Sequence, residues 1–172
     1  MSVFKDHKIS LKQVLDFIPE ALLSHLSATS KVDHYSKVLH GKKMFYLLLF
    51  CIFDNEKLSQ RTLEDTFNSS GFKALFGLGE EEKVRRSSIS ERLSKIDSNY
   101  FKEIYEQMYG RFSELYSKTE IEKYNLIRVD STIVADTCAK LKEGIDQKSG
   151  KKLVKFSFSF DGILPSGVEV FT

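Results

Sequence analysis

The sequence predicts an α+β fold, with a helical region over residues 1–122 followed by strands over residues 123–172. Two observations indicate this class. Apolar residues recur with helical spacing as far as about Lys118, and after Lys123 the spacing changes to strand-like alternation. A composition of 41% hydrophobic residues, with 14 Phe and 7 Tyr, is enough to fill a core and excludes wholesale disorder.

Several classes of protein are excluded at once. Cys51 and Cys138 stand alone, without a CxxC motif, which argues against a disulfide framework or a structural zinc site. The N-terminus lacks the apolar stretch of a signal peptide, so we expect a cytoplasmic protein. The most apolar run, residues 44–53, is about half of the roughly 20 residues that a membrane span needs. It predicts a buried core helix and no membrane partner.

The helical region is expected to hold five to seven short helices. Ser10 can cap the first helix, Pro19 suits the first turn of the second, and Ser59 marks the start of a helix over residues 60–67. Ser88 and Glu91 have the spacing of a capping box at the start of another helix. A long amphipathic helix follows, with apolar residues at Phe101, Ile104, Tyr105, Met108, Phe112, Leu115 and Tyr116.

Three strands are expected in the second region. Residues 126–134 form a β-branched run, residues 153–160 alternate between Val or Phe and polar side chains, and a short strand follows around residues 168–171. The alternation predicts that one face of the middle strand is buried.

Basic residues gather in two clusters although the whole chain carries a net charge of only +2. The segment 83–95 carries five positive charges against Glu91, and the segment 140–155 carries six against two. A helix start beside adjacent arginines favours phosphate binding, so double-stranded DNA is the expected partner. A solvated basic face is the plainer alternative. The residues assigned to DNA binding are Arg85, Arg86, Arg92 and Lys95 from the first cluster and Lys155 from the second.

Asp130 is the candidate metal ligand, because an acid on an apolar strand is not expected to be a solvated surface residue. Followed by Ser131 and Thr132, it could hold Mg²⁺ through oxygen atoms, although capping or turn formation is the alternative role. Asp136 lies about 20 Å along an extended strand, too far to share a site. Asp161 is explained by a turn before Gly162.

Three segments resemble, in order, the cut-and-paste DDE transposases of bacterial insertion sequences, specifically insertion sequence family four. The helical segments Leu58–Glu64 and Ser87–Leu93 look like the region that precedes the catalytic core in that family. Ile127–Thr132 is similar to the hydrophobic-Asp-Ser-Thr strand that opens a ribonuclease H-like mixed sheet. Lys151–Phe160 and the short strand after it are placed like the second and third strands of that sheet.

The resemblance implies that Asp130 is the first catalytic acid of a triad that binds two Mg²⁺ ions. In the complete enzyme these ions support phosphodiester hydrolysis and strand transfer during DNA transposition, a form of DNA recombination. The implied partners are terminal inverted repeats, and a second copy of the complete enzyme in a homodimer.

The second Asp and the Glu of that triad belong to segments downstream of the third strand. We therefore expect this chain to be a truncated form in which the ribonuclease H-like sheet is incomplete, inactive alone and without tightly bound Mg²⁺, but able to bind DNA. Whether it is an enzyme stays open. One rival is a small non-catalytic helical DNA-binding or regulatory module in which Asp130 is structural. Another is a protein-interaction domain, which predicts no DNA binding even at low salt.

Overall fold

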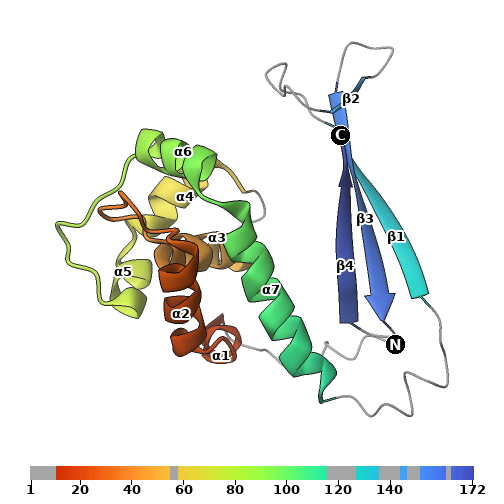
Figure 1. The fold of residues 1–172 in the computed structure, drawn as a ribbon. Coiled ribbons are helices and arrows are strands. Elements are labelled where there is room, and N and C mark those ends of the chain that lie inside the picture. The colour runs from red at the N-terminus through yellow and green to blue at the C-terminus, as the bar shows by residue number, and fades with distance from the viewer. Residues whose placement is uncertain (1–10, 55–57, 116–126, 136–143, 147–151, 162–163) are drawn as a thin grey trace. The chain divides into compact units, whose positions relative to one another are not determined.

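The computed structural model describes residues 11–54, 58–115, 127–135, 144–146, 152–161 and 164–172. It confirms the α+β class, with helices preceding strands along the chain (Figure 1). The chain divides into two compact units, Met1–Tyr105 and Glu106–Thr172. The expected boundary between residues 122 and 123 lies outside the described residues.

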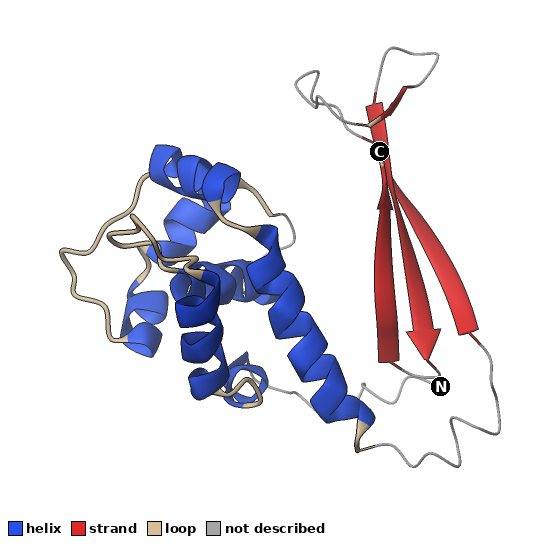
Figure 2. Ribbon diagram, viewed as in Figure 1, coloured by secondary structure: helices blue, strands red, loops and turns tan. Residues whose placement is uncertain are grey.

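Seven helices occur within the described residues, at the upper end of the expected number (Figure 2). Their bounds are α1 Leu11–Asp16, α2 Glu20–Ser30, α3 Gly41–Asp54, α4 Gln60–Phe67, α5 Ser70–Phe76, α6 Arg86–Lys95 and α7 Ser98–Ser113. The prediction for α4 is confirmed: Ser59 is its N-cap, and the Ser59 hydroxyl accepts a hydrogen bond from the Thr62 amide. Pro19 is the N-cap of α2, one position before the place expected. The predicted cap Ser10 lies outside the described residues.

The first unit closes around α3, which is the predicted buried core helix. Met44, Leu47 and Cys51 of α3 are fully buried in one cluster with residues of α4, α5 and α6. Phe72 of α5 packs at this centre, with its ring 4.5 Å from that of Phe76. Figure 1 shows α4 lying behind α6 in this unit. Local apolar periodicity therefore gave each helix a face that its neighbours bury.

The start of α3 requires a glycine. A Cβ atom at Gly41 would lie 2.7 Å from Cγ1 of Val32 and 3.1 Å from the ring of Tyr100 on α7. The Gly41 amide donates to the Asp33 carboxylate at 2.5 Å, so an acid side chain caps the helix start. The loop over residues 31–40 is thereby attached to α3.

The capping-box prediction for α6 is wrong. The helix begins at Arg86 with Arg85 as N-cap, and the Arg85 side chain makes no capping hydrogen bond. Ser88 therefore lies inside the first turn and not at the cap. The reason is that contacts from outside the helix fix where it starts, as described below for Asn68.

The second unit contains a sheet in which all pairings among the described residues are antiparallel. Its strands are β1 Ile127–Ala135, β2 Ile145–Asp146, β3 Lys152–Asp161 and β4 Leu164–Phe171. The central strand β3 pairs with β1 on one side and β4 on the other. β1 and β3 match the predicted strands to within one residue. β4 begins four residues before the short strand expected around residues 168–171, and the two-residue strand β2 was not predicted.

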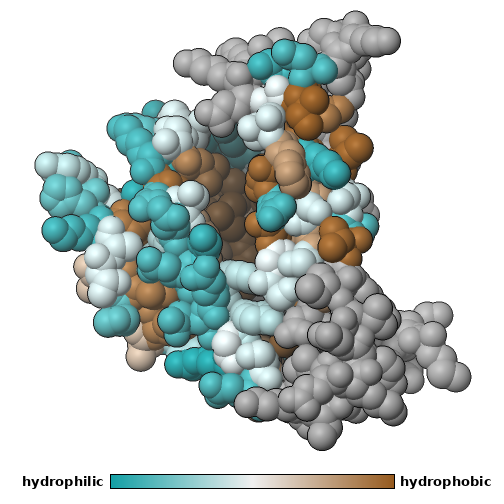
Figure 3. All heavy atoms as spheres, turned by 45° about the vertical axis from the view of Figure 1, so that its right-hand side comes forward, coloured by the Kyte–Doolittle hydropathy of each residue, from teal (hydrophilic) through white to brown (hydrophobic). Residues whose placement is uncertain are grey.

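The prediction that one face of the middle strand is buried is not met. Phe156, Phe158 and Phe160 share one face of β3 but are only partly buried, and no described residue of the second unit is buried. Val129 is 65% exposed and Val170 is 52% exposed. Apolar side chains accordingly lie at the surface of the strand unit in Figure 3. Among the described residues of the second unit itself, no second layer buries the apolar face of the sheet, as a face of this composition requires.

No helix among the described residues is both long enough and apolar enough to cross a membrane.

Candidate nucleic-acid interface

Helices α4 and α6 form the framework that presents the first basic cluster. Leu63 of α4 and Ile89 of α6 share the buried core. At the surface, the side-chain amide of Gln60 donates a hydrogen bond to the Ser90 hydroxyl at 3.2 Å. Apolar and polar contacts together therefore fix the position of α6 on α4.

Asn68 determines where α6 begins. It is the C-cap of α4, and its side-chain amide donates to the Val84 carbonyl at 2.9 Å while its carbonyl accepts from the Val84 amide at 3.0 Å. These two bonds fix the backbone at Val84, immediately before the N-cap Arg85, whose own backbone is extended. A side chain 16 positions earlier thus sets the start of the basic helix.

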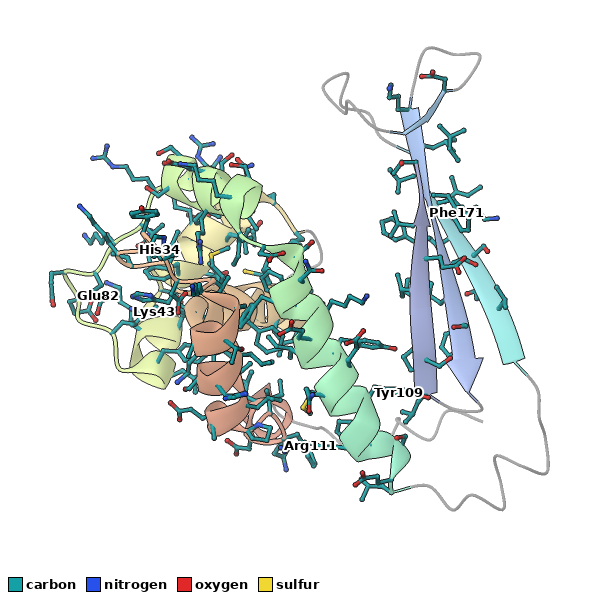
Figure 4. The ribbon with its side chains drawn as sticks, in the orientation of Figure 1. His34, Lys43, Glu82, Tyr109, Arg111 and Phe171 are labelled. Carbon is teal, nitrogen blue, oxygen red and sulfur yellow. The ribbon has the colours of Figure 1, made fainter. Side chains whose placement is uncertain are left out.

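The start of α6 favours an anion. Helical hydrogen bonding begins with the Ile89 amide, which donates to the Arg85 carbonyl at 3.1 Å, so the amides of residues 86–88 precede the ladder. Arg85 is exposed and has no ion-pair partner among the described residues. Arg86 is 62% exposed, with Nε 3.3 Å from Oε2 of Glu64. Nitrogen-tipped side chains project outward from the α6 region in Figure 4.

Arg92 turns the other way, into the protein. Its Nε donates to the Leu39 carbonyl at 2.8 Å, and its Nη2 donates to the Val32 carbonyl at 2.7 Å. Nη2 also lies 3.6 Å from the Asp33 carboxylate, and the side chain is only 12% exposed. Burial lowers the pKa of the Arg92 guanidinium, and Asp33 opposes that change. Arg92 therefore holds the 31–40 loop, and the prediction that it contacts DNA stays a prediction.

Lys95 is exposed at the end of α6. Its Nζ lies 2.6 Å from Oε1 of Glu91, one turn earlier, and this contact lowers the pKa of the Glu91 carboxyl. An exposed pair at this spacing contributes little to stability, so Lys95 stays able to contact a phosphate.

Two of the three acids that precede α6, Glu80 and Glu82, are engaged by lysines. Glu82 accepts from Lys43 Nζ at 3.0 Å (Figure 4), a hydrogen bond that lowers the pKa of Glu82 together with one from the Gly79 amide. Lys73 is almost fully buried, with Nζ 3.6 Å from the carboxylate of Glu80. These pairs reduce the negative field beside the exposed arginines.

Asp130 and Lys155 lie on opposite faces of the sheet. Asp130 pairs with Phe158 across β1 and β3, so it shares the face of the phenylalanines. Lys155 pairs with Ile133 and points to the other face, with Nζ 5.5 Å from the ring centroid of Phe171. The structure therefore does not bring these two predicted site residues together.

The burial expected for Asp130 is also wrong, because the residue is exposed in the middle of β1. Within the described part of the chain, no group of three or more His, Cys, Asp or Glu side chains is placed to hold a metal ion. Asp146 lies on β2 and Asp161 ends β3, while Asp136 and Glu143 lie outside the described residues.

Two positioning residues were missed from the sequence, Asn68 and Asp33. Asn68 stands in the turn-forming run Asn-Ser-Ser-Gly, which signals a helix end but not its partner 16 positions later. Asp33 stands between Lys31 and Lys37, in a polar stretch that carries no local signal for its contacts with Gly41 and Arg92. Both act through long-range contacts that local patterns do not encode.

No protein-family model, curated protein or solved structure matches this chain. The proposal for its function therefore depends on the contacts described above.

Proposed function

We propose that this chain binds duplex DNA through α4 and α6, as the N-terminal part of a DDE-type transposase similar to insertion sequence family four. The start of α6 carries the proposal. Arg85 and Arg86 are exposed beside amides that precede the helical ladder, and Asn68 fixes the backbone at Val84 immediately before them. Exposed cations beside the amides of a helix start suit the phosphates of a nucleic-acid backbone.

The strand unit supports the transposase part of the proposal. The first three strands of a ribonuclease H-like sheet are antiparallel neighbours in chain order, and β1, β3 and β4 have this arrangement with β3 in the centre. In this proposal Asp130 on β1 is the first ligand of a two-Mg²⁺ site, which needs a second Asp and a Glu to cut and join DNA. The DNA that follows the codon for Thr172 tests this part: reading frames without an Asp-bearing strand and a later Glu-bearing helix would contradict it.

DNA binding is tested by fluorescence anisotropy with a labelled duplex over a range of salt concentrations. We expect affinity that falls steeply as salt rises, because binding releases counterions from the DNA. Arg85→Ala should weaken binding to all duplex sequences and reduce the salt slope by about 1. Arg86→Ala should weaken it further, because it also leaves Glu64 unpaired beside the phosphates.

Two matched variants serve as controls. Arg111→Ala removes an exposed arginine from the last turn of α7 (Figure 4) and should leave affinity unchanged. Glu64→Gln removes the acid paired with Arg86 and should strengthen binding. Equal losses for Arg85→Ala and Arg111→Ala would show non-specific attraction, and an absence of binding at low salt would favour a protein-interaction domain.

A second candidate is a non-catalytic DNA-binding or regulatory module. The helical unit favours it, because that unit buries a core of its own. The two proposals share the α6 interface and differ at Asp130. In the module, Asp130→Asn changes no activity in any form of the protein, whereas in the transposase it abolishes Mg²⁺-dependent DNA cleavage by the complete enzyme.

A further inference from the structure

A pocket of about 710 Å³ lies between the 31–39 loop and α6, and its lining includes Arg92 and Lys95 of the predicted DNA-binding residues. Lysines from both elements line it. Lys31, Lys37 and Lys83 have no ion-pair partner among the described residues. Two acids also line the pocket: Glu91 is paired with Lys95, and the Asp97 carboxylate accepts a hydrogen bond from the Asn99 amide. The pocket therefore attracts an anion such as a phosphate.

Tyr35 stands at this pocket in an unusual state. Its side chain is 93% exposed and its backbone φ is 66°. A positive φ strains a bulky residue, and a fully exposed aromatic ring forgoes the burial that normally stabilises it. The neighbouring ring of His34 is 3.9 Å away, centroid to centroid, at an interplanar angle of 61°. Such strain persists only where surrounding contacts enforce it.

Those contacts are present. The Ser36 amide donates to the Asp33 carbonyl at 2.9 Å and closes the turn that contains Tyr35. The Asp33 carboxylate binds the Gly41 amide, and Arg92 of α6 donates to the Val32 carbonyl. The loop backbone is thus fastened on both sides of Tyr35, which presents its exposed ring among the pocket-lining lysines.

We propose that this pocket receives an unpaired nucleotide of bound DNA, with its base stacked on Tyr35 and its phosphate held by the lysines. The inference depends on the proposed DNA binding and extends it to a second contact. A duplex phosphate alone would need the lysines but no exposed aromatic ring. In a duplex the faces of the bases are already stacked on each other, so a free ring beside cations suits a base that has left the stack.

The test compares two fluorescent DNA probes with the full chain: a blunt duplex, and the same duplex with a short single-stranded thymidine tail. We expect the tail to strengthen binding about 5- to 150-fold, the range that stacking of one base on an aromatic side chain gives. Tyr35→Ala should abolish this gain and leave binding to the blunt duplex unchanged. Tyr35→Phe, which keeps the ring, should retain the gain. Arg85→Ala should weaken binding to both probes.

Tyr35→Gly provides a second variant if Tyr35→Ala does not fold, because glycine suits the positive φ. A tail that gives no gain, or a Tyr35 variant that weakens both probes equally, would overturn the inference while duplex binding still supports the proposed function. A chain that binds neither probe at low salt would overturn both. Free single-stranded thymidine as a third probe separates a frayed duplex end from single-stranded DNA as the source of the nucleotide.

Discussion

The helical unit and the strand unit use similar apolar residues with opposite results. Phe67 and Phe72 of the helices are fully buried, whereas Phe156, Phe158 and Phe160 of β3 are only partly buried. Helices that follow one another along the chain bury each other's apolar faces. The four-stranded sheet has two faces, and neither is covered among the described residues of the second unit. The spacing of apolar residues therefore determines which face of an element is apolar, but it does not determine whether another element buries that face.

The largest expected effect tests this comparison directly. Phe67→Ala should destabilise the helical unit by about 3–5 kcal/mol, through lost burial and the cavity that remains. Phe158→Ala, the matched change on β3, should cost only about 1 kcal/mol because its ring is partly exposed. Hydrogen-exchange mass spectrometry measures the opening free energy of each segment. If Phe67→Ala and Phe158→Ala lowered the opening free energy equally, the face of the sheet that carries Phe158 would have to be covered.

A second prediction separates the two arginines of α6. Arg92→Met keeps much of the side-chain volume but loses the hydrogen bonds to Val32 and Leu39, and should cost about 2 kcal/mol. Arg85→Met removes an exposed charge and should leave stability within about 0.5 kcal/mol. Urea unfolding followed by circular dichroism compares them. Similar unfolding midpoints would contradict the structural role of Arg92.

A third prediction concerns the polar contacts of each unit. Asn68→Asp keeps the acceptor for the Val84 amide but loses the donor to the Val84 carbonyl, and should cost about 1 kcal/mol. Ser131→Ala removes the 3.2 Å hydroxyl contact to Ser157 on the exposed sheet and should cost almost nothing. Thermal unfolding distinguishes the two. A neutral Asn68→Asp would show that Asn68 does not fix the start of α6.

The smallest expected effect depends on pH. Lys43 and the Gly79 amide hold the pKa of Glu82 below its ordinary value, so the ionised form is favoured in the folded state. Its contribution is therefore present above the ordinary pKa of a glutamate and is lost as pH falls through the lowered one. Urea midpoints of the wild type and Glu82→Gln should differ slightly at neutral pH and converge in acid. If the difference between the two urea midpoints widened in acid, ionised Glu82 would not be the form that stabilises the fold.

The sequence predicted those elements whose signals are local. The Ser59 cap and the apolar spacing located α4, and the alternating phenylalanines located β3, because helix and strand periods are properties of neighbouring residues. The start of α6 was misplaced because Asn68, far earlier in the chain, outweighs the capping pattern of Ser88 and Glu91.

The candidate site was predictable only in part. Sequence shows Arg85 and Arg92 as equal members of one basic cluster, whereas the fold turns Arg92 toward carbonyls 53 and 60 positions away. Asp130 was predicted as a metal ligand and Lys155 as a DNA-binding residue, and the pairing register places them on opposite faces of the sheet. Register depends on contacts between strands, which no single strand encodes.

The close approach at Gly41 gives the chain a recognisable signature for a search among genomes. Any side chain there meets Val32 and Tyr100, while Asp33 must bind both the Gly41 amide and Arg92. Related proteins that keep this loop should therefore retain aspartate, glycine and arginine together, with the glycine eight positions after the aspartate and the arginine 51 positions after the glycine. If one of these three residues is lost, the other two are no longer constrained and should vary. Proteins that keep all three would therefore be recognisable as relatives even where overall sequence identity is low.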